Sequence, residues 1–312
     1  MKPKSSEKWL GDFIHEEGVA ALVAATVKGR SGRTTAAIFE IKSIVDDFRM
    51  QRIRGIVAAF ELWEKAIIPS LLNNAETWTE ISEECMEELE DLQFLFVRTI
   101  METAKSTPKT SLLWETGLLP MRERISRRKL TFISHIRKSG NDTLVKKVFQ
   151  EQQKNEWPGL IRECELLCNE LEIPNISTHK EIILKKEIKS VTKEKAKNDI
   201  INEMTSSSKM KDKINEKYEM KEYFQNKVIS EVRTMFSVRS GMFKCKMNYK
   251  NDRQFKRKLW FCGNCAIGAV DTLSHILVCE GFKSLREGKD ISSDKDLVQY
   301  YQKVQTIREK SW

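Results

Sequence analysis

The stretch 260–286 reads W-F-C-G-N-C-A-I-G-A-V-D-T-L-S-H-I-L-V-C-E-G-F-K-S-L-R. It contains a C-x2-C-x9-H-x3-C pattern formed by Cys262, Cys265, His275 and Cys279. Two cysteines separated by two residues can form a tight turn whose amides face the sulfurs, and the later pair lies about one helical turn apart. Three thiolates and one imidazole suit tetrahedral zinc and leave no open position, so the pattern predicts a structural zinc site that folds this part of the chain.

The other uses of these cysteines are weaker interpretations. A redox role for Cys262 and Cys265 is disfavoured because no βαβ pattern surrounds them, and ordinary buried thiols beside a histidine do not explain both spacings. The chain has seven cysteines, an odd number that favours a reducing interior over a disulfide scaffold. Cys164 and Cys168 either bind metal or line a helical core, and the two leucines between them favour the core.

Basic and aromatic residues alternate just before the zinc pattern. Residues 243–262 carry seven bases and one acid, with five aromatic rings among them. Cations neutralise phosphates and rings stack on bases, so this composition is typical of a nucleic-acid surface. The alternative is a solvated loop whose rings pack against the zinc core. The candidate nucleic-acid contacts in this segment are Lys244, Lys246, Lys256, Arg257 and Lys258.

The composition limits the classes of protein and partner. In 312 residues there are 54 Lys and Arg against 45 Asp and Glu, a net charge of +9 that favours an anionic partner. The length allows more than one domain. No apolar run could span a bilayer and the N-terminus lacks a signal-peptide core, so we expect no membrane partner and a location inside the cell, in the nucleus.

Apolar residues recur at helical spacing through most of the chain, which predicts a mainly α fold. The exception is residues 8–14, which predict a strand with a bend at Gly11. We expect a break between two helices at residues 29–32 and a kink or end at Pro69. We also expect a helix that begins with a cap at Ser82 and buries one stripe, Cys85, Leu89, Leu92, Phe96 and Ile100.

Bases also gather outside the zinc region. Segment 121–140 has seven bases against a single acid, Glu123, and either lies along a duplex backbone or is a solvated helix on a core. We expect its basic triplet at 127–129 to be exposed. The candidate nucleic-acid contacts outside the zinc region are Lys8, Trp9, Arg30, Arg33, Arg52, Arg54, Arg127, Arg128 and Lys129.

Asp46 and Asp47 look like the paired aspartates with which polymerases bind two magnesium ions. Such a pair must lie on a strand turn and face other carboxylates. Here the spacing of Ile41, Val45 and Phe48 predicts a helix with both aspartates on its solvent flank. We therefore expect no catalytic residues and no enzymatic activity from this chain.

Several segments resemble, in shared order, the C-terminal part of the reverse transcriptases of non-LTR retrotransposons. Residues 9–11 (W-L-G) resemble the primer-grip hairpin, and 67–78 (I-I-P-S-L-L-N-N-A-E-T-W) resemble the thumb. Residues 113–120 (L-W-E-T-G-L-L-P), followed by 127–130 (R-R-K-L), resemble the segment after the thumb. Residues 239–242 (R-S-G-M) and the zinc pattern resemble the nucleic-acid-binding end of such proteins. The resemblance covers most of the chain.

The resemblance implies a helical thumb-like bundle, a charged helical linker and a zinc module, without the polymerase active site. No palm or fingers precede Trp9, which stands where tyrosine is usual, and the abrupt start favours a chain cut from a longer protein. The implied divisions are 1–118 (primer-grip strand and thumb-like domain), 119–240 (basic and charged helical linker), 241–288 (CCHC zinc module with its basic-aromatic flank) and 289–312 (C-terminal helix).

Two functions follow from these expectations. The first is a nucleic-acid-binding fragment that grips template–primer or element RNA, and target DNA as a further partner, with zinc as a structural cofactor. The alternative is an exapted structural or interaction protein in which zinc only stabilises the fold. Salt-dependent binding of RNA or DNA discriminates between them. The sequence leaves RNA-versus-DNA preference and oligomeric state open.

Overall fold

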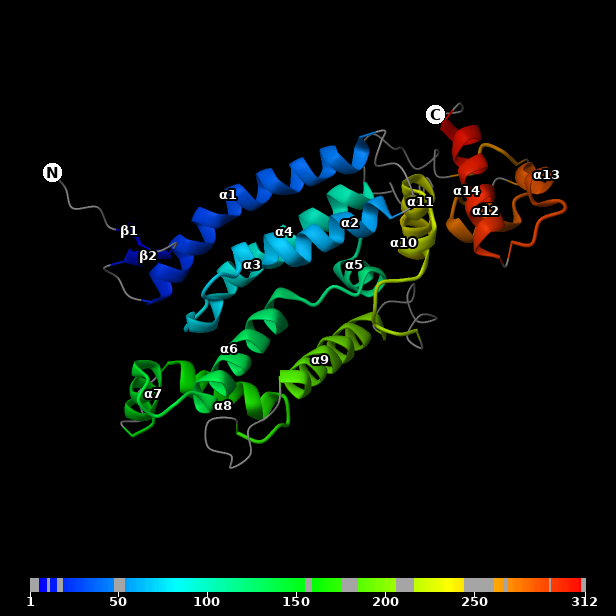
Figure 1. The fold of residues 1–312 in the computed structure, drawn as a ribbon. Helices are drawn as coiled ribbons and strands as arrows, with labels where there is room; N and C mark the ends of the chain where they lie inside the picture. The colour runs from blue at the N-terminus through cyan, green and yellow to red at the C-terminus, as the bar shows by residue number, and fades with distance from the viewer. Residues whose placement is uncertain are drawn as a thin grey trace.

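The computed structural model of the protein describes residues 6–9, 12–15, 19–47, 54–154, 159–175, 185–205, 216–243, 261–265, 267, 269–291 and 293–309. The fold is mainly α-helical, as the sequence predicts (Figure 1). The elements are β1 (Ser6–Trp9), β2 (Asp12–His15), α1 (Val19–Asp46), α2 (Gly55–Leu62), η2 (Trp63–Ile67), α3 (Ile68–Leu71), η3 (Ala75–Thr77), α4 (Glu83–Met101), α5 (Lys109–Thr116), α6 (Met121–Lys138), α7 (Leu144–Lys154), α8 (Leu160–Glu170), α9 (Lys185–Thr205), α10 (Tyr223–Asn226), α11 (Ile229–Arg239), α12 (Leu273–Val278), η7 (Glu280–Phe282), α13 (Lys283–Arg286) and α14 (Asp294–Glu309).

The strand expected near the N-terminus is part of a two-stranded antiparallel hairpin. In its register Ser6 pairs with His15 and Trp9 pairs with Asp12. Every other element of the described chain is helical apart from one isolated bridge, between Phe261 and Val270. No helix within the described ranges is long and apolar enough to cross a bilayer.

The break expected at residues 29–32 is wrong, because α1 is continuous through both glycines. A glycine inside a helix costs about 1 kcal/mol relative to alanine. Tertiary packing overrides that cost here, since one stripe of α1 is buried along its length and packs against α4. The buried residues of this stripe are Val23, Val27, Arg30, Thr34, Ile38, Ile41 and Val45.

Pro69 changes the geometry of its helix without ending it there. The helix continues from α2 through the π-helical turn η2 into α3, with Pro69 in the first turn of α3. Proline supplies no N–H to the carbonyl four residues earlier and its ring crowds that carbonyl, which accounts for a wider turn at this point. The widened turn contains Trp63, whose fully buried ring stacks on the Phe96 ring with the ring centroids 4.4 Å apart.

The expected start of α4 is confirmed. The Ser82 side chain accepts a hydrogen bond from the backbone N–H of Cys85 at 3.3 Å, and Glu83 and Glu84 occupy the first turn, where carboxylates favour the positive end of the helix. The stripe expected to be buried is buried, and consists of Cys85, Leu89, Leu92, Phe96 and Ile100.

Buried residues gather in three cores. The first joins α1–α5 and the start of α6 to the end of α9, α10 and α11. The second joins the end of α6 to α7, α8 and the start of α9. It contains Cys164 and Cys168, both fully buried, and burial raises the pKa of Cys164, as expected of core thiols. The third joins Phe243 and the zinc pattern to α14.

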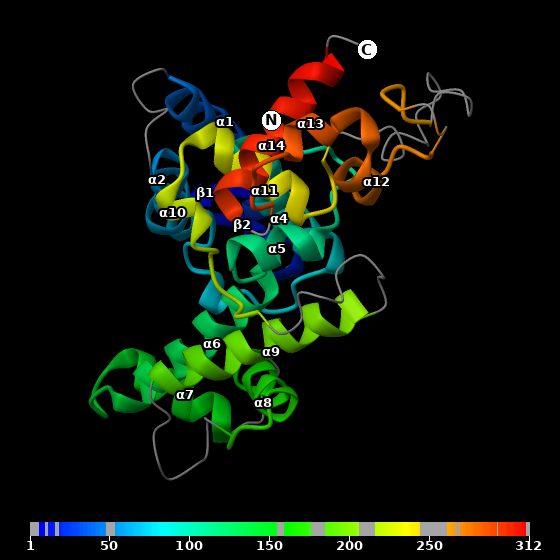
Figure 2. The same cartoon turned by 90° about the vertical axis from the view of Figure 1, so that its right-hand side faces the viewer.

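Two helices connect the first core to the second. Both α6 and α9 begin in one core and end in the other, and they pack against each other (Figures 1 and 2). In both views α7 lies at one end of the molecule and α12 at the other. The cores therefore cut across the divisions drawn from the sequence: residues 196–204 and 218–236 of the expected linker contribute to the first core, and α14 packs on the core that contains the predicted zinc ligands.

Candidate metal centre and nucleic-acid contacts

The structure brings the four predicted metal ligands into one cluster. Their ligand atoms all lie within 4.8 Å of one another. Cys262 Sγ lies 3.6 Å from Cys279 Sγ, and Cys265 Sγ lies 3.4 Å from His275 Nε2. Zinc bond lengths of about 2.3 Å to sulfur and 2.0–2.1 Å to nitrogen give tetrahedral edges of about 3.8 Å and about 3.5 Å. The cluster therefore has the size and the donor chemistry of a Cys3His zinc site.

Local backbone structure places each ligand. The isolated bridge between Phe261 and Val270 and the hydrogen bond from Cys262 N–H to Ala269 O (2.8 Å) fix the first cysteine turn. Thr272 caps α12, because its Oγ1 accepts from His275 N–H at 3.1 Å. The cap holds His275 in the first turn of α12, and Cys279 then follows the end of this helix.

The two cysteine turns approach each other so closely that one position must be glycine. A Cβ atom placed on Gly281 would lie 1.7 Å from the carbonyl oxygen of Asn264. Gly281 lies two residues after Cys279, and Asn264 directly precedes Cys265. The close approach therefore sets the distance between the ligands that precede and follow α12.

Helices α13 and α14 support the cluster from outside. The Tyr300 hydroxyl donates to Ile276 O, and the Arg286 guanidinium donates to Cys279 O at 2.8 Å. A buried ion pair between Arg308 and Asp271 joins the end of α14 to the residue before the Thr272 cap. Such outer contacts fix the orientation of the residues that bind a metal directly. The residues that build this site therefore include these supporting side chains as well as its four ligands.

The thiols differ in how readily they ionise. Burial raises the pKa of Cys279 to about 12, and its hydrogen bond with Cys262 adds to the shift. Burial acts against ionisation of Cys265 as well, but the backbone N–H of Ile267 and the neighbouring thiols outweigh it and lower its pKa. Zinc takes thiolates, so binding must release the Cys279 proton, and zinc affinity should rise with pH.

The aspartate pair that resembles a polymerase site lies at the end of α1. Asp46 is held by Lys42 and by Arg233, whose Nη2 lies 2.7 Å from its Oδ1. Both aspartates are exposed on a helix end, as expected, and no strand turn is present there. Within the part of the chain that the structure describes, the zinc pattern is the only group of three or more His, Cys, Asp or Glu placed to share a metal.

The prediction that Arg30 is a surface base that contacts nucleic acid is wrong. Arg30 is only 5% exposed, and Nη1 donates to Leu71 O (3.1 Å) and Asn73 O (2.7 Å). Its guanidinium also lies over the Trp78 ring, 5.5 Å from the centroid. Arg30 thus satisfies carbonyl groups at the end of α3.

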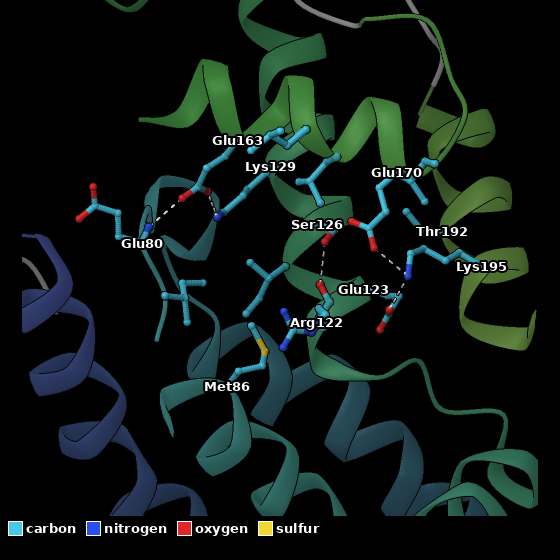
Figure 3. Close-up of a pocket in the computed structure, with 15 residues that line it drawn as sticks. Glu80, Met86, Arg122, Glu123, Ser126, Lys129, Glu163, Glu170, Thr192 and Lys195 are labelled. Atoms are coloured by element: carbon cyan, nitrogen blue, oxygen red, sulfur yellow. Dashed lines mark hydrogen bonds and ion pairs between the residues drawn. The ribbon is translucent and has the colours of Figure 1, made fainter. Parts of the chain in front are cut away.

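The exposure expected for the triplet 127–129 is also wrong. Lys129 is buried and forms an ion pair with Glu163 of α8 (Figure 3). Arg128 lies 3.5 Å from Glu76, and Arg127 donates to Thr192 Oγ1 (2.9 Å) and Lys189 O on α9 (3.2 Å). Successive residues of a helix point about 100° apart, so three adjacent bases on α6 meet three different neighbouring elements.

Figure 3 shows the pocket beside this triplet, a cavity of about 300 Å³ between α6, α8 and α9. Its charges are largely paired: Lys129 with Glu163, and Lys195 with Glu170 at 3.0 Å. Burial raises the pKa of Glu123 to about 7, with Glu90 and Asp199 adding to the shift and Lys195 opposing it. Lys129 and Lys195 in this pocket therefore already form ion pairs with carboxylates of the protein.

The remaining predicted contacts divide into two groups. Arg33 and Arg54 are exposed, and Arg54 adopts a left-handed backbone conformation (φ 77°) directly before α2. The others are Lys8, Trp9, Arg52, Lys244, Lys246, Lys256, Arg257 and Lys258, whose side chains lie outside the described part of the structure.

One set of bases was missed by sequence reasoning. Lys185, Lys189 and Lys193 lie one turn apart on α9 and all are exposed. Their i, i+4, i+8 spacing was the available signal. Charged residues occur on several faces of α9, so this spacing does not stand out in the sequence.

Comparisons with known proteins do not identify a family. No family model, curated protein or solved structure matches this chain.

Proposed function

We propose that this chain is a zinc-stabilised nucleic-acid-binding protein of the nucleus, equivalent to the C-terminal part of a non-LTR retrotransposon reverse transcriptase. It would grip template–primer or element RNA, and target DNA. The four-ligand cluster supports the zinc component, because its distances and donors fit a Cys3His site. In such a site zinc supplies folding energy and no reaction chemistry.

One observation carries the step from zinc to nucleic acid. The residues on either side of the basic segment 244–260, Phe243 and Phe261, both contact the module that contains the four candidate metal ligands. Phe243 is buried against Tyr301, with ring centroids 4.7 Å apart, and Phe261 pairs with Val270 beside the first cysteine turn. Seven bases lie between these two anchors. Folding of the zinc core therefore brings the ends of a strongly basic segment to one small module, which suits a phosphate backbone.

The module is too small to fold on apolar burial alone. Among the residues that the structure describes, its core contains eight buried side chains, two of which are predicted zinc ligands, Cys262 and Cys279. Cores of this size usually require a metal or disulfides. We therefore expect zinc removal to unfold the module and to release the basic segment from its anchors.

The scaffold alternative has its own support. Arg30, Arg127, Arg128 and Lys129 were expected to contact nucleic acid, yet each makes a hydrogen bond or ion pair within the chain. In a scaffold protein these contacts would be the main role of the bases. Zinc would then hold the C-terminal region in shape without a nucleic-acid partner.

Fluorescence anisotropy with labelled RNA and DNA of one sequence, between 50 and 200 mM salt, separates the two functions. We expect steep salt dependence for the zinc-loaded chain. Replacing Lys256, Arg257 and Lys258 by Gln should reduce the slope of log affinity against log salt by about two to three. A control with equal charge loss is Lys28→Gln, Lys105→Gln and Lys147→Gln, exposed positions elsewhere in the chain. Full zinc content without salt-dependent binding would favour the scaffold.

A further inference from the structure

The two edges of α9 differ in charge balance. On one edge, Lys195 lies 3.0 Å from Glu170 and 3.9 Å from Glu123 (Figure 3). It also lies 2.7 Å from Asp199. The opposite edge carries Lys185, Lys189 and Lys193, here called the lysine row. All three are exposed, and no carboxylate within the described ranges forms an ion pair with them. Cationic charge is therefore neutralised on one edge and left available on the other.

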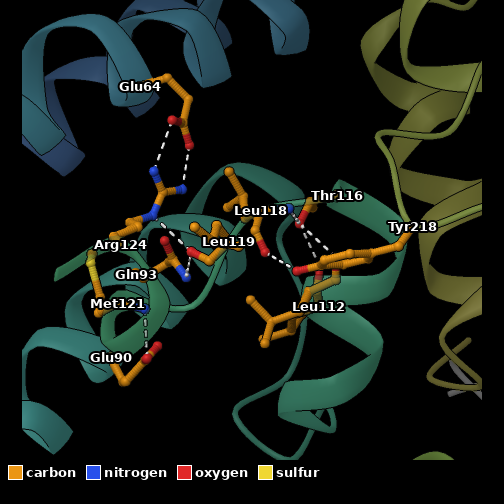
Figure 4. Close-up of polar contacts among 11 residues, drawn as sticks. Glu64, Glu90, Gln93, Leu112, Thr116, Leu118, Leu119, Met121, Arg124 and Tyr218 are labelled. Atoms are coloured by element: carbon orange, nitrogen blue, oxygen red, sulfur yellow. Dashed lines mark hydrogen bonds and ion pairs between the residues drawn. The ribbon is translucent and has the colours of Figure 1, made fainter. Parts of the chain in front are cut away.

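Lys189 and Lys193 of the lysine row border a groove of about 510 Å³ between α2, η2, α6, α9 and the segment 116–119. Two acids in its lining are matched by bases: Glu61 pairs with Lys65 at 2.8 Å, and Glu64 pairs with Arg124 through two contacts (Figure 4). Of the described lining carboxylates, only Glu219 lacks an ion pair. Arg127, Lys189 and Lys193 therefore leave the groove with an excess of positive charge.

The groove wall is fixed by hydrogen bonds. Leu119 O accepts from Arg124 Nε at 2.7 Å and from Gln93 Nε2 at 3.2 Å, and the Tyr218 hydroxyl donates to Leu118 O (Figure 4). Gly117 has φ 65°, and a Cβ there would lie 2.4 Å from the Met220 nitrogen. A wall already held in this way loses little conformational freedom when a ligand binds.

We infer that the lysine row and the adjoining groove bind the phosphate backbone of a nucleic acid, as a second contact surface besides the zinc module. This inference rests on the proposed function. Residues four apart rise about 6 Å along a helix, so the row extends over about 12 Å, the axial length of three to four phosphates on one duplex strand.

Two physical features favour this ligand. Lysines at i, i+4 spacing repel one another, and bound phosphates relieve that repulsion. The row also continues into the groove through Arg127, which donates to Lys189 O and is half-buried. A backbone lying along α9 would thus meet separate cations at regular intervals and then a rigid groove, whereas an acidic peptide offers no fixed spacing of charge.

The test replaces Lys185, Lys189 and Lys193 by Gln in the full, zinc-loaded chain. Three lost phosphate contacts should reduce the salt slope by about 2.7 on duplex and about 2.1 on single strands. Between 50 and 200 mM salt, duplex affinity should then fall about 40-fold less than for wild type. The matched control is the Lys28, Lys105 and Lys147 triple, which removes the same charge and should keep the wild-type slope.

The outcomes separate this inference from the proposed function. If wild type shows no salt-dependent binding to RNA or DNA, both proposals fail. If wild type binds and the lysine-row variant matches the control triple, with equal thermal unfolding curves, only the second surface is overturned. Tighter binding of polyglutamate than of either nucleic acid, lost in the lysine-row variant, would also overturn it and assign the surface to an acidic protein.

Discussion

Gly281→Ala should disrupt the zinc centre although it removes no ligand. The added Cβ would lie 1.7 Å from the carbonyl oxygen of Asn264, whereas real Cβ atoms essentially never approach closer than 3.0 Å. The two cysteine turns would have to separate by about 1.3 Å, the difference between those distances. The obstacle is backbone, so no side-chain rotation can relieve the contact.

This displacement is large for a metal site. Ligand distances in functional sites hold to about 0.2 Å, so a shift several times greater should detach or distort at least one ligand next to the moved segments. Loss of outer-shell support alone typically costs 10–100-fold in metal affinity. We expect Gly281→Ala to bind zinc at least about 100-fold more weakly than wild type.

The assay is competition for zinc against a chromogenic chelator, with metal content measured after dialysis. Gly288→Ala is the matched control in the same module, since it meets nothing within 4 Å. Alanine in this left-handed backbone conformation (φ 73°) should lower the free energy of unfolding by about 1–2 kcal/mol. It should not displace a metal ligand, because the added Cβ contacts nothing. Wild-type zinc affinity in Gly281→Ala would refute the close approach of the two turns and the site geometry built on it.

Three further predictions concern the helical part of the chain. Glu115 is fully buried and accepts from Arg239 (2.7 Å) and Tyr223 (3.0 Å), so Glu115→Ala should lower the free energy of unfolding by about 3–5 kcal/mol in urea titrations; a loss below 1 kcal/mol would contradict the buried pairing. Burial raises the pKa of Glu123 from 4.5 to about 7, so the folded state retains a proton that the unfolded chain releases. Stability should therefore fall by up to about 3 kcal/mol as pH rises from about 4.5 to 7, and Glu123→Gln should remove this dependence; an unchanged pH profile in the variant would assign it to another group. Because Lys42 and Arg233 hold Asp46, the chain should not extend a primer with Mg²⁺ or Mn²⁺, and activity that Asp46→Asn abolishes would show that this expectation is wrong.

Local rules predicted the features that depend on short spacings. The spacing within each pair of candidate metal ligands (Cys262 with Cys265, His275 with Cys279), the Ser82 cap and the buried stripe of α4 all depend on residues a few positions apart in sequence. The core placement of Cys164 and Cys168 followed from the apolar residues between them. In such patterns the spacing along the chain fixes how the residues lie relative to one another, so predictions made from them are correct in most tertiary contexts.

The failures arose where distant segments decided the outcome. The glycines at 29 and 32 predicted a break, but contact between α1 and α4 keeps the helix continuous. The sequence predicts a surface base at Arg30, but its guanidinium donates to carbonyl groups more than 40 residues away, at Leu71 and Asn73. Lys129 pairs with Glu163, 34 residues later. A charge count along the sequence cannot distinguish a base that meets solvent from one that meets a partner brought in by folding.

The most direct test of the zinc centre is X-ray absorption at the zinc edge of the purified, zinc-loaded protein. The predicted first shell is three sulfurs at about 2.3 Å and one nitrogen at about 2.0–2.1 Å, from Cys262, Cys265, Cys279 and His275. A shell dominated by oxygen or nitrogen, or the same spectrum from the variant with Cys262→Ser and Cys279→Ser, would contradict it.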